Sequence, residues 1–164
     1  MVGLISLALV ASLAELPQPR PPEFDPRLFR NPPVVTCPEG QPDFAPGTLI
    51  SHLTICPFGL TPPSLWLDAS LAPPQVLLGW LTTIRGSTSP GWVDLVVDID
   101  SWAQMGYLDR FRFLSRFGQT ATQERYNVRL FTVEGEPLGS YLCRYEPQRR
   151  PHDCQTQLDY RGRP

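Results

Sequence analysis

The sequence predicts an α+β fold in which one layer of helix covers a mixed β-sheet. Three observations predict it. Residues 92–100 alternate apolar and polar side chains, as in a strand with one buried face. Residues 101–122 repeat apolar side chains at helical spacing, and strand-like runs at 126–133 and 138–145 flank a turn at 134–137. Strand, long helix and strand in this order form a β-α-β unit with parallel strands, and the hairpin adds an antiparallel edge.

The region before residue 92 is predicted from shorter patterns. Residues 64–68 form a short apolar run and are expected to be a strand. Residues 75–83 are expected to be a helix, because two prolines precede them and apolar residues recur at helical spacing. A strand is the alternative there, since Gly79 and the β-branched residues at 82–84 disfavour a helix.

The long helix is expected to begin at Asp100 or Ser101, because both residue types are good N-caps, and to extend to about residue 122. Arg110 is the one charged residue whose position around the predicted helix falls on the apolar face of that helix. The stripe consists of residues spaced to face the sheet, namely Tyr107, Phe111, Leu114, Gly118 and Ala121, widened by Phe113 and Phe117.

Prolines divide the chain into segments. The 164 residues suffice for one domain, and a hydrophobic content of 41% suffices for its core. Residues 15–63 hold 13 of the 20 prolines, which exclude helix interiors and central strands. We therefore expect a Pro-rich extended arm at 15–63, an α+β domain at 64–158 and a frayed tail at 159–164.

The first fourteen residues have the composition of a secretory signal peptide. They are apolar or small, and no charge precedes Glu15. Small residues at Ser12 and Ala14 predict cleavage after Ala14. The run is too short to cross a bilayer, so we expect no membrane span in the mature chain. A short buried helix is the alternative, since no lysine or arginine precedes the apolar run.

Four cysteines in an exported chain predict two disulfides. Three pairings are possible. We favour Cys37 with Cys56 and Cys143 with Cys154, because each of these pairs lies within one segment. In the chain-entropy model a disulfide closing a loop of this size stabilises the fold by about 3 kcal/mol. The alternative is four buried thiols in a reducing compartment.

Composition and motifs exclude several functions. The net charge is −2, and all 14 basic residues are arginine, which disfavours a sequence-independent nucleic-acid binder. The only histidines, His52 and His152, lie far apart in the sequence, so we expect no metal site and no metal cofactor. The sequence contains no G-x-S-x-G, P-loop or G-x-G-x-x-G motif, so we predict no catalytic residue and no cofactor.

Charged residues near the predicted sheet suggest ion pairs or a ligand site. Asp94, Asp98 and Asp100 are placed on one face of the strand, where the last two are about 7 Å apart and close enough to share a cation. We expect instead a solvated face on which Arg129, on the next strand, pairs with Asp94 or Asp98. Arg110 is expected to pack its stem on the core, with its head either paired or extended to solvent; clamping a ligand is the alternative.

Aromatic side chains supply the candidate partner surface. Trp66 and Trp102 are the tryptophans that we expect at a protein interface, and Phe24 and Phe29 are candidate anchors in the arm. The Pro-rich arm is expected to dock on a partner as an extended chain; the alternative is that it wraps its own domain or extends freely into solvent.

Several runs resemble a family of small exported cyanobacterial proteins that has no assigned activity. The resemblance covers about residues 62–154 and implies a periplasmic or thylakoid-lumen location, a later cysteine following Tyr-x-Cys, and no catalytic residue. The sequence departs from the family near Trp66, where a second tryptophan is missing. The similar runs are Pro-Pro-Ser-Leu-Trp at 62–66, Val-Asp-Leu-Val-Val at 93–97, Tyr-Leu-Asp-Arg-Phe-Arg-Phe at 107–113, Phe-Gly at 117–118, Tyr-Asn-Val-Arg-Leu-Phe at 126–131 and Tyr-Leu-Cys at 141–143.

Together these observations predict an exported, non-catalytic binding or accessory protein. We expect it to associate with a membrane-linked protein complex, which the resemblance suggests. The alternative is a small exported enzyme or ligand-binding domain that uses Arg110 with Asp98 and Asp100.

Overall fold

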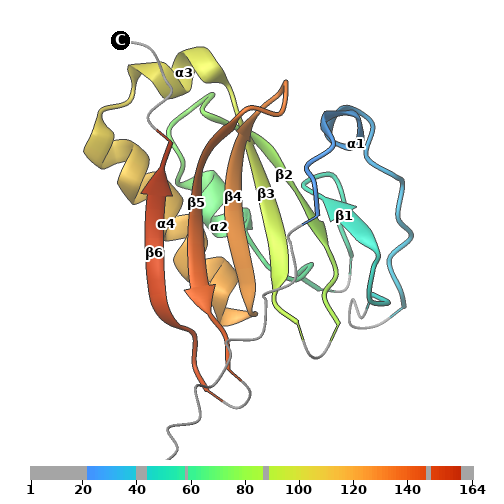
Figure 1. Cartoon of the computed structure of the whole chain (residues 1–164). Helices are drawn as coiled ribbons and strands as arrows, with labels where there is room; N and C mark the ends of the chain where they lie inside the picture. Colours follow the sequence, from blue (N-terminus) through green and yellow to red (C-terminus); the bar gives the residue numbers. More distant parts are fainter. Residues whose placement is uncertain (1–21, 40–43, 58, 87–88, 147–148, 160–164) are drawn as a thin grey trace, which may run out of the picture.

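A computed structural model describes residues 22–39, 44–57, 59–86, 89–146 and 149–159, and its centre is one six-stranded mixed sheet (Figure 1). The segment at 1–14, predicted as a signal peptide, lies outside the described residues. Among those described, no helix has the length and apolar character needed to cross a membrane.

The sheet confirms the predicted fold class. Its strands follow one another in space in the same order as in the sequence. β3 and β4 are parallel, as the β-α-β unit requires, and every other neighbouring pair is antiparallel. The strands are β1 (Leu49–Ser51), β2 (Leu77–Thr83), β3 (Gly91–Val97), β4 (Tyr126–Thr132), β5 (Pro137–Arg144) and β6 (His152–Leu158).

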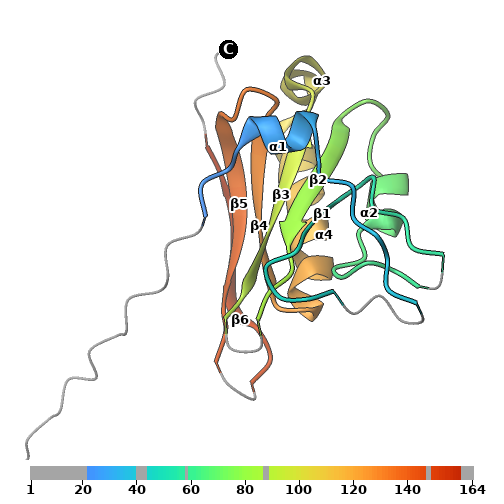
Figure 2. The same ribbon diagram turned by 90° about the vertical axis from the view of Figure 1, so that its right-hand side faces the viewer.

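The main core lies between the sheet and α4 (Tyr107–Gln123), which packs on β4, β5 and β6. Val93 and Val97 of β3 are fully buried on this side, as the alternating pattern predicts. Figure 2 shows the sheet nearly edge-on, with α4 along one of its faces. Tyr107 and Phe111 were expected in the apolar stripe of this helix but are exposed. The buried face is turned away from them and consists of Phe113, Leu114, Phe117, Gly118, Ala121 and Thr122.

Part of the opposite sheet face is covered by the Pro-rich segment. Phe24 stacks on Phe131 of β4 with ring centroids 4.4 Å apart and packs with Leu81 and Val96. The short helix α1 (Pro26–Arg30) follows, with its first turn capped by the Asp25 carboxylate. The predicted extended arm therefore also contains a single-turn helix and the edge strand β1.

Two predicted elements before β3 are wrong in type. Residues 64–68 were expected to be a strand, but α2 (Trp66–Ser70) is helical. Residues 75–83 were expected to be a helix, but β2 forms there, as in the alternative. Gln75 adopts a φ of +67°, which is incompatible with a helix, and β2 pairs with both β1 and β3.

The predicted long helix is two helices. α3 (Ile99–Gln104) is capped by Asp98, which accepts a hydrogen bond from the Ser101 amide at 2.8 Å, rather than by Asp100 or Ser101. Met105 and Gly106 are extended and separate α3 from α4. Arg110 donates to the carbonyls of Trp102 and Ala103 at the end of α3. In a continuous helix these carbonyls would accept from backbone amides further along the chain, so Arg110 replaces those bonds where the helix breaks.

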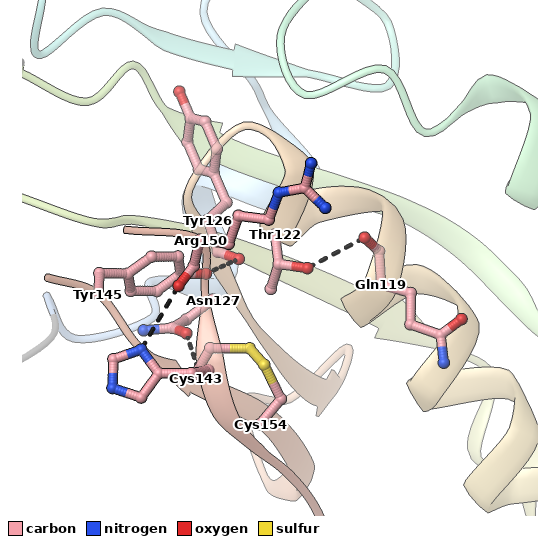
Figure 3. Close-up of a disulfide and its surroundings, with 9 residues drawn as sticks. Gln119, Thr122, Tyr126, Asn127, Cys143, Tyr145, Arg150 and Cys154 are labelled. Atoms are coloured by element: carbon pink, nitrogen blue, oxygen red, sulfur yellow. Dashed lines mark hydrogen bonds between the residues drawn. A yellow bond between two sulfur atoms is a disulfide. The ribbon is translucent and has the colours of Figure 1, made fainter. Parts of the chain in front are cut away.

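Both disulfides form with the favoured pairing. Cys37–Cys56 closes the Pro-rich segment, and Cys143–Cys154 joins β5 to β6 (Figure 3). No strand was predicted at β6. Two disulfides fit a protein of an oxidising, extracytoplasmic compartment.

Candidate functional site

The predicted ion pair forms between Arg129 and Asp94 on neighbouring parallel strands. The two guanidinium nitrogens Nε and Nη2 donate to the two carboxylate oxygens at 2.7 and 2.8 Å, which is a bidentate arrangement. Arg129 also donates to the Pro22 carbonyl and lies over the Trp92 ring. Burial raises the pKa of the Asp94 carboxyl above its ordinary value, and the bonds from Arg129 oppose that shift.

The other predicted site residues are not brought together as a ligand clamp. Asp98 is the N-cap of α3, and the bond from the Ser101 amide lowers the pKa of its carboxyl. Asp100 lies in the first turn of α3. The head of Arg110 was expected to be paired, and its partners are the carbonyls of Trp102 and Ala103 at the far end of the same helix. The three charged side chains therefore serve the ends of α3.

The aromatic residues expected at a partner surface are mostly internal. Trp102 is 3% exposed and packs edge-on against Phe113, while Phe24 is 9% exposed and packs on the sheet. Trp66 is half-buried and meets Trp80 edge-on at 5.0 Å. Phe29 is half-buried against the ring of His52. These four rings pack against other side chains of this small domain. They therefore stabilise the fold and do not form an exposed surface for a partner.

The His52 ring connects the Pro-rich segment to the sheet, and this predicts a pH-dependent stability. It lies between Phe29 and Trp80, and burial lowers its pKa below the ordinary 6.5. A lowered pKa means that the unfolded chain binds protons more readily, so stability is present above pH 6.5 and is lost as pH falls. Urea unfolding at a series of pH values should show this loss, and His52→Gln should remove it. Equal pH profiles for both proteins would contradict this role for His52.

A different set of apolar side chains faces water, on α2 and the first turns of α4. Leu67 of α2 and its C-cap Leu71 are one turn apart, and Leu108 and Phe111 lie on the same side of α4. All four are exposed, Leu71 by 57%. Sequence reasoning missed them because it read 64–68 as a strand and placed Phe111 in the core stripe. The spacing of Leu67 and Leu71, four residues apart, is the signal that a helical interpretation would have used.

Leu71 and Phe111 border a groove between the two helices, here called the α2–α4 groove. Its volume is about 540 Å³, and Met105 lies in its wall. Two arginines stand at its rim. Arg112 is 74% exposed and reaches Asp109 at 3.4 Å. Apolar walls with cations at the edge suit the binding of a chain segment that carries apolar and acidic side chains.

The second arginine at this rim is incompletely paired. Arg116 donates to the Leu71 carbonyl at 3.0 Å, and its Nε lies 3.8 Å from the Asp68 carboxylate. That Nε is buried and has no hydrogen-bond partner among the described residues. The Arg116 side chain as a whole is 39% exposed, so the outer part of its guanidinium remains open to an incoming carboxylate at the rim.

The chain belongs to the structural class of small α+β domains, with one helical layer on a mixed sheet and two disulfides that cross-link it. Comparisons of the chain with protein-family models, with curated proteins and with solved structures found no match.

Proposed function

We propose that this chain is an exported, non-catalytic binding domain that attaches to a membrane-linked protein complex. The observation that carries the proposal is the α2–α4 groove, where Leu71 and Phe111 are exposed beside Arg112 and Arg116. Contiguous apolar surface rimmed by polar groups is typical of sites that bind other proteins.

The charges of the groove indicate the chemistry of its partner. Arg112 has a largely exposed guanidinium, and the Arg116 side chain is 39% exposed at the same rim. A partner segment that places leucine-like side chains against Leu71 and a carboxylate between the two guanidiniums would satisfy both features. The complementary partner is therefore an apolar and acidic segment of another protein.

The compartment is proposed on two grounds. Disulfides persist where the environment is oxidising, and this chain has two. The resemblance of residues 62–154 to exported cyanobacterial proteins favours the periplasm or the thylakoid lumen. Mass analysis of the mature chain from fractionated cells tests this part, and a full-length chain in the cytoplasmic fraction would contradict it.

The docking surface is tested by placing a photo-crosslinking residue at position 71 in the cells that produce the protein. Leu53 is the matched control, because it is also an exposed leucine, by 64%, outside the groove. We expect one discrete adduct in the membrane fraction from position 71 and none from position 53. The exposed Arg112 permits a charge reversal without loss of folding, so Arg112→Glu should abolish the adduct.

Two results would overturn the docking proposal. One is an identical adduct pattern from positions 71 and 53, which would mean that contact is not specific to the groove. The other is an adduct at position 71 that persists in Arg112→Glu, because charge complementarity would then play no part in binding.

A further inference from the structure

The sheet face opposite α4 holds a second hollow, here called the sheet-face cleft. It lies beyond the part of this face that Phe24 and α1 cover, and its volume is about 860 Å³. Such a volume is in the range of sites for small molecules. Four neighbouring strands, β3 to β6, contribute Trp92, Asn127, Leu142 and Gln157 to its lining.

The side-chain amide of Asn127, in the lining of this cleft, has an N–H donor without a hydrogen-bond partner among the described residues. The residue is only 6% exposed, and its Oδ1 accepts a hydrogen bond from the Cys143 amide at 2.9 Å (Figure 3). Its Nδ2 has no partner among the described residues. The buried side-chain atoms that lack a partner do not include this nitrogen, so Nδ2 is accessible and can donate to an acceptor that a ligand brings into the cleft.

The remaining lining holds neutral amides and charged groups that already have partners in the fold. Arg85 is one of these, and it donates to the Glu124 and Gly86 carbonyls. Gln155 and Gln157 expose two primary amides, each both a donor and an acceptor. Arg144 is within 3.9 Å of the Asp153 carboxylate, so the two charges compensate each other. Trp92 adds a partly exposed ring, one side of which faces the Arg129 guanidinium at 5.1 Å.

We propose that the sheet-face cleft binds a neutral oligosaccharide. Sugar hydroxyls both donate and accept hydrogen bonds, as the amides of Asn127, Gln155 and Gln157 require. The apolar face of a sugar ring fits beside an indole and a leucine, here Trp92 and Leu142. An extended peptide is less suited, because the backbone groups of interior strands are engaged in the sheet and only side chains face the cleft. This site is separate from the α2–α4 groove.

The test is an NMR titration of the full chain with cellotetraose, maltotetraose and the tetramer of N-acetylglucosamine. The side-chain N–H signals of Trp92 and Asn127 report directly on the cleft. We expect at least one of the three sugars to shift both signals with saturation. Trp92→Leu should weaken that binding about tenfold, the size expected for losing an aromatic contact.

Exposed glutamines provide a matched pair that leaves folding intact. Gln157→Ala removes an amide from the cleft and should weaken binding about threefold or more, as expected for one neutral hydrogen bond. Gln119→Ala removes the same amide from the outer side of α4 and should leave binding unchanged. The proposal is overturned if no sugar moves the two signals, or if Gln157→Ala binds as tightly as Gln119→Ala. Neither result bears on crosslinking at position 71.

Discussion

Replacing Arg129 with alanine should lower the free energy of unfolding by about 3–5 kcal/mol, the range for breaking one side of a buried ion pair. The Asp94 side chain is 14% exposed, so the change leaves a carboxylate in the sheet without the two hydrogen bonds that satisfy it. It also removes the contact to the Pro22 carbonyl, which ties the Pro-rich segment to β4. Urea unfolding of the purified variant measures the effect.

The control is Arg112→Ala, which breaks a pair of the same chemical type in water. Both partners of that pair are largely exposed, so its loss should change stability by less than about 0.5 kcal/mol. Equal losses for Arg112→Ala and Arg129→Ala would contradict the buried-pair account. A double variant that replaces Asp94 and Arg129 with apolar residues should lose less than Arg129→Ala alone, since no uncompensated charge remains.

The Arg129→Ala deficit should also depend on pH. Burial already raises the pKa of Asp94 while Arg129 opposes that shift, so removing Arg129 raises the pKa further. The folded variant then binds a proton more readily than the unfolded chain, whose ordinary value is 3.8. The loss of stability in Arg129→Ala is therefore complete above the pKa of Asp94 in the folded variant. It becomes smaller as pH falls through that pKa, because Asp94 is then protonated and no longer charged. A deficit that does not change with pH would show that Asp94 is not its cause.

The sequence predicted those parts of the molecule where local pattern and tertiary packing agree. The alternation around Val93 and Val97 predicted β3, and the order of elements then predicted its parallel pairing with β4. An arginine among apolar residues on one strand predicted an acid opposite, either Asp94 or Asp98, and the register of the parallel pair selects Asp94. Close spacing in the chain similarly favoured the two disulfides.

The missed parts are those where tertiary context overrides the local pattern. β6 carries polar residues such as Gln155 and Gln157 on an edge strand, so no apolar alternation marks it. β2 is buried on both faces for much of its length, so its sequence is a nearly continuous apolar run. Such a run shows neither the alternation of a strand nor the spacing of a helix, and hydrophobic periodicity cannot distinguish the two. The helix break at Gly106 depends on Arg110, whose bonds to α3 no local pattern reveals.

Replacing Gly118 with alanine should destabilise the fold by about 2 kcal/mol, although alanine is the better helix residue by about 1 kcal/mol. Gly118 lies in the middle of α4, where a Cβ would stand 2.1 Å from Cγ of Tyr141 on β5. Tyr141 is buried, so rotating its ring away would drive it into neighbouring core side chains, and either the ring repacks or the helix moves away from the sheet. Thermal or urea unfolding measures the change.

Two controls test whether contact with Tyr141 causes the loss of stability in Gly118→Ala: a glycine that lacks such a contact, and a double-mutant cycle. A Cβ at Gly86 would meet no atom within 4 Å, so Gly86→Ala should change stability by less than about 0.5 kcal/mol. Tyr141→Ala alone should cost about 3–5 kcal/mol through loss of a buried ring. In Gly118→Ala with Tyr141→Ala the new methyl group occupies space that the ring has left, so the double loss should be smaller than the sum of the single losses. Additive losses would mean that α4 and β5 do not meet at these two residues.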